Sequence, residues 1–184
     1  PSTARCYIMV TPDGERTMNT FLGAAQNLTP NDIDANAVAA ASITYLEGYL
    51  WDPPQAKEAF RKAAKIAHDN KRQVALTLSD SFCVSRYRAE FVELIRSGTV
   101  DLLFANESEL LSLYETANFD TAVKALQADA KAHKPTHKGL DQGKQPRKQV
   151  VIVQGGPGTG KTVVAVNLLA ALLQRQRNAR YVSK

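Results

Sequence analysis

The alternation of short apolar runs with longer amphipathic stretches constrains the fold of this chain more than any other feature. Apolar runs at residues 42–46, 73–78 and 100–105 are separated by segments whose apolar residues recur every three or four positions. Strands that alternate with helices in this way indicate βαβ units, in which parallel strands are joined by right-handed crossovers. We therefore predict an α/β fold with a mostly parallel twisted sheet and helices on both faces.

Further strands extend the predicted sheet on both sides of this central part. Residues 5–11 and 16–21 are separated by turn residues, Pro12 to Glu15, and predict a hairpin or a strand with a sharp reversal. Thr29 followed by Pro30 predicts the start of a helix. The complete prediction has seven strands, at 5–11, 16–21, 42–46, 73–78, 100–105, 149–153 and 180–183, and helices that include residues 107–115 and 120–130.

The strongest motif follows the apolar strand predicted at residues 149–153. It has the pattern G-x-x-x-x-G-K-[ST], a phosphate-binding P-loop or Walker A sequence. Glycines let successive backbone N–H groups approach a phosphate, and the start of the next helix adds partial positive charge. We expect ATP or phosphate as the ligand, with Lys161 on the β/γ-phosphates and the Thr162 hydroxyl on Mg²⁺. The predicted binding residues are Gly155, Gly156, Gly158, Thr159, Gly160, Lys161 and Thr162.

Carboxylates are missing from the end of the chain, where a P-loop would need one. No Asp or Glu follows Asp141, although a P-loop NTPase holds its Mg²⁺ with an acidic residue on a second strand. The ligand would have to be Asp80, Glu107 or Glu109, each of which follows an apolar strand. The carboxyl ends of such strands are where α/β sheets bind ligands.

Charge is distributed unevenly along the chain. The formal net charge of +5 combines −5 over residues 1–129 with +10 over residues 130–184. Residues 130–148 are rich in basic side chains and contain Pro and Gly, so we predict a basic linker. A basic run of this kind is usually a solvated surface, and nucleic acid is not an expected partner.

The remaining composition favours a globular, cytoplasmic protein that does not enter a membrane. An apolar content of 44% excludes a disordered chain, and the N-terminus lacks the pattern of a secretory signal. The longest apolar stretch, residues 163–173, is too short to span a bilayer. Cys6 and Cys83 lack metal-ligand spacing and are expected to be buried thiols, with a disulfide as the alternative.

Four segments carry a resemblance to a known family: residues 10–18, 45–50, 76–80 and 104–109. Through them, residues 5–128 resemble the middle of a sugar or nucleoside kinase of the ribokinase (PfkB) family, closest to its adenosine-kinase-like bacterial members. The resemblance implies ATP-dependent phosphorylation of a sugar or nucleoside. It also nominates Asn106 and Glu109, which match the N-x-x-E motif that the family associates with Mg²⁺ and phosphate. The alternative is a helix capping box, which needs no metal.

The chain also departs from that family's pattern. The family's N-terminal Gly-Gly region and lid have no counterpart here, and no segment of residues 110–184 matches its later G-A-G-D motif, which supplies the catalytic Asp. Without a base to take the hydroxyl proton, phosphoryl transfer loses a major contribution. We therefore identify no catalytic residue from the sequence and expect an incomplete catalytic site.

Residues 146–184 resemble a second family, the bacterial helicase-like, Schlafen-associated P-loop ATPases. The chain then looks like two pieces joined near residues 129–146, with a kinase-like part at 1–129, the linker at 130–148 and a P-loop unit at 149–184. A P-loop piece of this size cannot bury its own core. It should pack on the first part or on a second copy, so self-association through an open sheet edge is an expected interaction.

These observations leave three hypotheses open. The first is ATP or phosphate binding through the P-loop of a truncated or chimeric kinase-like protein, with Mg²⁺ as the accompanying cofactor. The second is an ATP-dependent sugar or nucleoside kinase of the PfkB family. The third is a folded recombinant or composite chain without an evolved activity.

Overall fold

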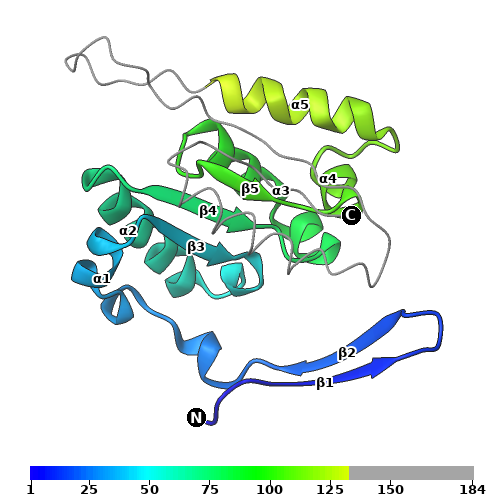
Figure 1. The fold of residues 1–184 in the computed structure, drawn as a ribbon, viewed down its shortest axis with the longest axis horizontal. Helices are drawn as coiled ribbons and strands as arrows, with labels where there is room; N and C mark the ends of the chain where they lie inside the picture. Colours follow the sequence, from blue (N-terminus) through cyan, green and yellow to red (C-terminus); the bar gives the residue numbers. More distant parts are fainter. Residues whose placement is uncertain (133–184) are drawn as a thin grey trace.

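A three-stranded parallel sheet forms the centre of the computed structural model, which describes residues 1–132 (Figure 1). The strands β3 (Ile43–Glu47), β4 (Gln73–Thr77) and β5 (Leu102–Phe104) pair in this order. The helices α2 (Pro54–Asp69) and α3 (Ser81–Arg96) connect them, as in a βαβ unit. The predicted α/β fold with parallel strands and connecting helices is therefore confirmed.

The other elements surround this sheet. A short helix α1 (Ala35–Ala40) precedes β3, and α4 (Glu107–Leu113) and α5 (Phe119–Ala132) follow β5. Single 3₁₀ turns occur at Gly23–Asn27, Pro30–Asp32 and Gly48–Trp51. Within the described part, the predicted strands and helices after residue 40 all occur, and no end that was predicted is shifted by more than two residues.

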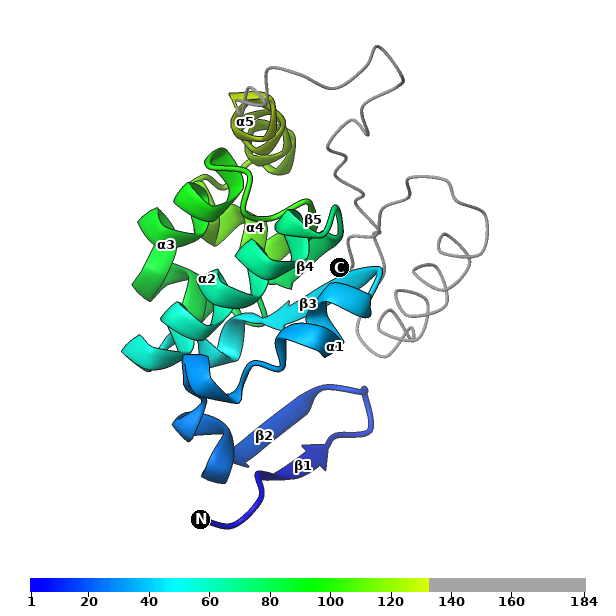
Figure 2. The ribbon, with the colours of Figure 1, turned by 90° about the vertical axis from the view of Figure 1, so that its left-hand side faces the viewer.

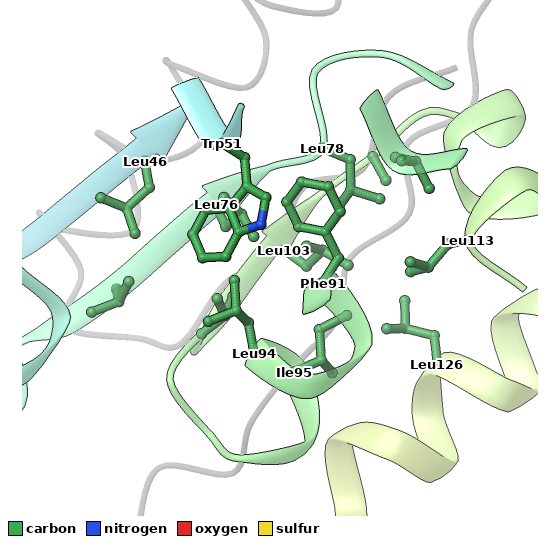
Figure 3. Close-up of a cluster of buried hydrophobic side chains, with 14 of the residues drawn as sticks. Leu46, Trp51, Leu76, Leu78, Phe91, Leu94, Ile95, Leu103, Leu113 and Leu126 are labelled. Carbon is green, nitrogen blue, oxygen red and sulfur yellow. The ribbon is translucent and has the colours of Figure 1, made fainter. Parts of the chain in front are cut away.

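The core lies between the sheet and the two crossover helices, which are on one side of it (Figure 2). β4 is the central strand, and its Val74, Ala75 and Leu76 are fully buried. α2 buries mainly small alanines, which let this helix approach the strands closely. Trp51 is also fully buried, and Figure 3 shows its ring next to that of Phe91 in the core. Its ring centroid lies 5.7 Å from that of Phe91 and 5.6 Å from that of Phe60.

The N-terminal hairpin corrects one part of the predicted topology. β1 (Arg5–Val10) and β2 (Arg16–Phe21) pair antiparallel, as expected, but they form their own two-stranded sheet instead of joining the parallel one. Every residue of both strands is exposed within the described structure. Cys6 on β1 is therefore exposed, contrary to the expectation of a buried thiol, whereas Cys83 is buried and both thiols are free.

The helix predicted at Thr29 is also shorter than expected. Thr29 caps only the turn Pro30–Asp32. The Asp32 carboxylate accepts from both the backbone N–H and the hydroxyl of Thr29 and closes a capping box. Ile33 is extended, so the chain leaves the turn at once. Helix α1 begins separately, with Asp34 as its N-cap.

Residues 130–132, predicted as the start of the basic linker at 130–148, instead form the end of helix α5. The rest of that linker, the strands predicted at 149–153 and 180–183, and the whole P-loop lie outside the described residues. No helix within residues 1–132 has both the length and the apolar character needed to cross a membrane.

A buried carboxylate fixes the last described helix to the rest of the fold. Asp129 on α5 is 7% exposed. Its Oδ1 accepts from Nε of Arg96 on α3 at 2.8 Å, and its Oδ2 accepts from the Tyr114 hydroxyl at 3.1 Å. Three segments that are distant in sequence therefore meet at one carboxylate.

We expect Asp129→Ala to lower the free energy of unfolding by about 1–2 kcal/mol, because it removes the acceptor of two hydrogen bonds, from the Tyr114 hydroxyl and from the partly exposed Arg96 guanidinium. Asp69→Ala is the matched control, since Asp69 pairs with Lys65 in an exposed ion pair on α2; its loss should cost about 0.5 kcal/mol or less. Urea unfolding monitored by circular dichroism measures both. Equal losses in the two variants would contradict the anchoring role of Asp129.

Candidate functional site

The carboxyl ends of β3, β4 and β5 bring several polar residues to one edge of the sheet. Because the three strands are parallel, the segments that follow them meet at the same edge. β3 ends at Glu47, β4 is followed by Ser79 and Asp80, and β5 is followed by Asn106. This carboxyl edge, comprising residues 47–49, 78–80 and 106–109, is the candidate site.

Asn106 and Glu109 form a complete capping box at the start of α4. The Asn106 side-chain oxygen accepts from the Glu109 N–H at 2.8 Å. In return, Oε2 of Glu109 accepts from the Asn106 N–H at 3.0 Å, and Oε1 accepts from Asn106 Nδ2 at 2.7 Å. The predicted alternative, a helix capping box, is therefore present in the structure. It does not exclude ligand binding, because each carboxylate oxygen keeps a further lone pair.

Burial makes the Glu109 carboxyl unusual. The side chain is 5% exposed, and this desolvation raises its pKa from the ordinary 4.5 to about 7. The backbone hydrogen bond from Asn106 opposes the shift, and the negative charge of Asp80 adds to it. Glu109 thus titrates near neutral pH and senses the charge of Asp80.

Asp80 is the second acidic side chain that the sequence nominated. Its Oδ1 accepts from the Cys83 N–H at 2.7 Å and caps α3. Among residues 1–132, this is the hydrogen bond that the Asp80 carboxylate accepts, and it involves Oδ1 and not Oδ2. Asp80 and Glu109 are acidic oxygen donors of the kind that Mg²⁺ prefers. No group of three or more acidic, His or Cys side chains suited to a metal occurs among residues 1–132, so a bound Mg²⁺ would need further ligands from phosphate or water.

The structure thus brings Asp80, Asn106 and Glu109 together, and it places Glu107 beside them in the first turn of α4. It describes none of the predicted P-loop residues, from Gly155 to Thr162. Sequence reasoning did not select Glu47 and Ser79, which also lie at the carboxyl edge. The sequence could have indicated Glu47, because it directly follows an apolar strand, and the selected residues Asp80 and Asn106 have similar positions after the next two strands.

We expect Glu109→Gln to flatten the pH dependence of stability. With a folded pKa raised to about 7, the folded state binds more protons than the unfolded state between pH 4.5 and 7. Wild-type stability should therefore fall as pH rises through this range, by about 3 kcal/mol in total. A glutamine does not titrate, so the variant should lose most of this fall.

Urea unfolding at several pH values between 4 and 8 measures the effect. Glu58→Gln, at an exposed position on α2, is the control and should keep the wild-type slope. If Glu109→Gln and wild type have parallel pH profiles, the burial argument for Glu109 fails.

Several solved structures that are similar to this chain are described as kinases. A probable sugar kinase from Rhizobium etli is 58% identical over 70% of this chain, with a TM-score of 0.67. An adenosine kinase from Sinorhizobium meliloti is 44% identical over 97% of this chain, with a TM-score of 0.77. A putative ribokinase II from E. coli, solved with ATP and Mg²⁺, is 16% identical over 67% of this chain with a TM-score of 0.55 and shows the fold alone.

The chain spans only part of these relatives: 39% of the Rhizobium protein, 56% of the Sinorhizobium protein and 41% of the E. coli protein. A comparison with curated proteins gave no match. A family model for the Schlafen group 3 DNA/RNA helicase domain matches residues 148–184, which lie outside the described residues.

The model of the pfkB family carbohydrate kinases matches residues 1–159. This match runs past the join expected near residues 129–146, so a chimeric origin stays a prediction. It covers most of the 184 residues and agrees with the identity to the two bacterial kinases. The chain therefore belongs to the pfkB carbohydrate kinase family.

Proposed function

We propose that this chain takes part in ATP-dependent phosphorylation of a sugar or nucleoside hydroxyl. The observation that carries the proposal is the meeting of Asp80 with the Asn106–Glu109 pair at the carboxyl edge. Membership of the pfkB family and the identity to a structure described as an adenosine kinase support it. These findings favour the kinase hypothesis over simple phosphate binding by a P-loop.

The proposed reaction breaks the bond between the γ-phosphorus of ATP and its bridging oxygen. A bond forms from the acceptor hydroxyl oxygen to that phosphorus, and the hydroxyl proton leaves. Mg²⁺, when bound, neutralises charge on the phosphate oxygens. In this chain the Asp80 carboxylate would orient the metal–phosphate group, and Glu109 would add negative charge in its ionised form. We assign the proton acceptor to no residue of the described part.

Loading with Mg²⁺ should favour the ionised form of Glu109, because a nearby cation lowers the pKa of a carboxyl group. The capping hydrogen bonds from Asn106 would meanwhile keep both carboxylate oxygens in place. Because ATP is the proposed phosphoryl donor, we expect the protein to work in the cytoplasm.

We expect Asp80→Asn to reduce phosphorylation by about 10- to 100-fold, the loss usual for residues that support a metal site. Asparagine is as good an N-cap as aspartate, so helix α3 should keep its cap while the charge is lost. Asp34→Asn is the matched control, because Asp34 caps α1 through the N–H groups of Asn36 and Ala37 and is not part of the carboxyl edge.

Release of ADP, measured in a coupled assay with adenosine, ribose and fructose, provides the readout. Wild type and Asp34→Asn should agree within about twofold, the scatter expected for a distant surface change. A wild-type chain that forms no acceptor-dependent ADP would contradict the proposed function. Equal activity in Asp80→Asn would remove Asp80 from the site.

We further propose that the segment Gly155–Thr162, in a P-loop unit at residues 149–184, binds phosphate or ATP, as its pattern predicts. The similarity of residues 148–184 to a helicase domain favours this second candidate function. Lys161→Ala should weaken binding of a fluorescent ATP analogue about tenfold or more, through loss of a charged phosphate contact. The control is Lys184→Ala, at a lysine outside the motif. Equal affinity in Lys161→Ala and wild type would exclude the P-loop as a nucleotide site.

A further inference from the structure

Ser79 has a backbone conformation that serine rarely adopts. Its φ is +70°, in the left-handed region that favours glycine. The Asp80 N–H donates to the Leu78 carbonyl at 2.9 Å, so Ser79 is the central residue of a tight three-residue turn. Strain of this kind persists only where the surroundings enforce it, and it is concentrated at functional sites.

The neighbouring loop after β3 enforces this turn. The Ser79 hydroxyl accepts from the Tyr49 N–H at 3.2 Å and donates to Oε2 of Glu47 at 3.3 Å. The Ser79 N–H donates to the Thr77 hydroxyl at 3.3 Å. Between these contacts lies Gly48, where an added Cβ would come within 2.7 Å of the carbonyl oxygens of Thr77 and Leu78. The two loops are therefore packed backbone against backbone, with the Ser79 hydroxyl as the link between them.

Through this link, Ser79 determines the orientation of the Glu47 carboxylate. One carboxylate oxygen of Glu47 accepts from the Ser79 hydroxyl. Two half-exposed rings lie close to Glu47 in the sequence, that of Tyr45 on β3 and that of Tyr49 in the loop after it. Burial, together with the charge of Glu47, raises the pKa of Tyr45 to about 12, so its hydroxyl stays protonated beside the carboxylate. Glu47 belongs to no metal-type cluster within residues 1–132. A carboxylate in this position is instead suited to accept a hydrogen bond from a hydroxyl group of a ligand.

We propose that Ser79 is a positioning residue for the phosphoryl acceptor. Its hydroxyl holds the Glu47 carboxylate at the carboxyl edge, toward the hydroxyl-bearing substrate, and its strained turn sets Asp80 next to it. This inference rests on the proposed kinase function and adds a residue that acts through Glu47. Loss of the Ser79 hydroxyl should therefore weaken binding of the acceptor more than binding of ATP.

Two variants of Ser79 distinguish the effect of losing the hydroxyl from the effect of the strained backbone. Ser79→Ala removes the hydroxyl and keeps a side chain in the left-handed conformation. Ser79→Gly also removes the hydroxyl but relieves the strain, so it should melt at a higher temperature than Ser79→Ala. Ser97→Ala is the control, since it removes a hydroxyl at the end of α3 that bonds the Leu94 carbonyl and Thr99.

The experiment measures KM for the acceptor and for ATP in the full chain, with the acceptor that wild type phosphorylates best. Both Ser79 variants should raise the acceptor KM about tenfold, because a misplaced binding group is costly. The KM for ATP should stay within twofold of wild type, and Ser97→Ala should match wild type in both constants.

An unchanged acceptor KM in both Ser79 variants would overturn the inference and leave the proposed function intact. Recovery of the wild-type acceptor KM in Ser79→Gly would also overturn it, because the effect of Ser79→Ala would then come from strain or stability. A wild-type chain inactive with every acceptor would refute the proposed function, and the inference would fail with it.

Discussion

The parallel pairing of β3, β4 and β5 is the constraint on which the rest of the structure depends. Parallel strands need crossovers, and here α2 and α3 supply them and bury one side of the sheet around Trp51 and Phe91. The same pairing sends the three carboxyl ends to one edge. Residues that follow three different strands therefore meet at this edge, although the first and the last of them, Glu47 and Glu109, are more than 60 positions apart in the sequence.

At this edge, the groups that stabilise the fold are also those that offer chemistry. Glu109 caps α4 together with Asn106, and Asp80 caps α3. Each cap fixes a carboxylate at a helix N-terminus, where the helix dipole favours negative charge. Burial has the opposite effect on Glu109 and is the larger influence on its pKa. The result is a carboxyl group that is held rigidly and changes its charge near neutral pH.

The strands of the sheet and the capping box at α4 could be predicted from the sequence, because the local pattern of residues determines them. The apolar runs predicted β3, β4 and β5, and the spacing of Asn106 and Glu109 predicted both a capping box and a family motif. What could not be predicted depended on contacts between distant segments. The separation of the hairpin β1–β2 from the parallel sheet is one example, and the bond from Ser79 to Glu47 across 32 positions is another.

We propose the carboxyl edge as a ligand site of this chain, in addition to any role of the P-loop sequence. The most direct measurement is a backbone amide NMR titration of the full chain with Mg·ATP and then adenosine. We predict that the amides of Tyr49, Asp80 and Glu109 shift with saturable, ligand-dependent curves. Shifts confined to residues 155–162, or no shifts at the carboxyl edge with either ligand, would show that the carboxyl edge is not a ligand site.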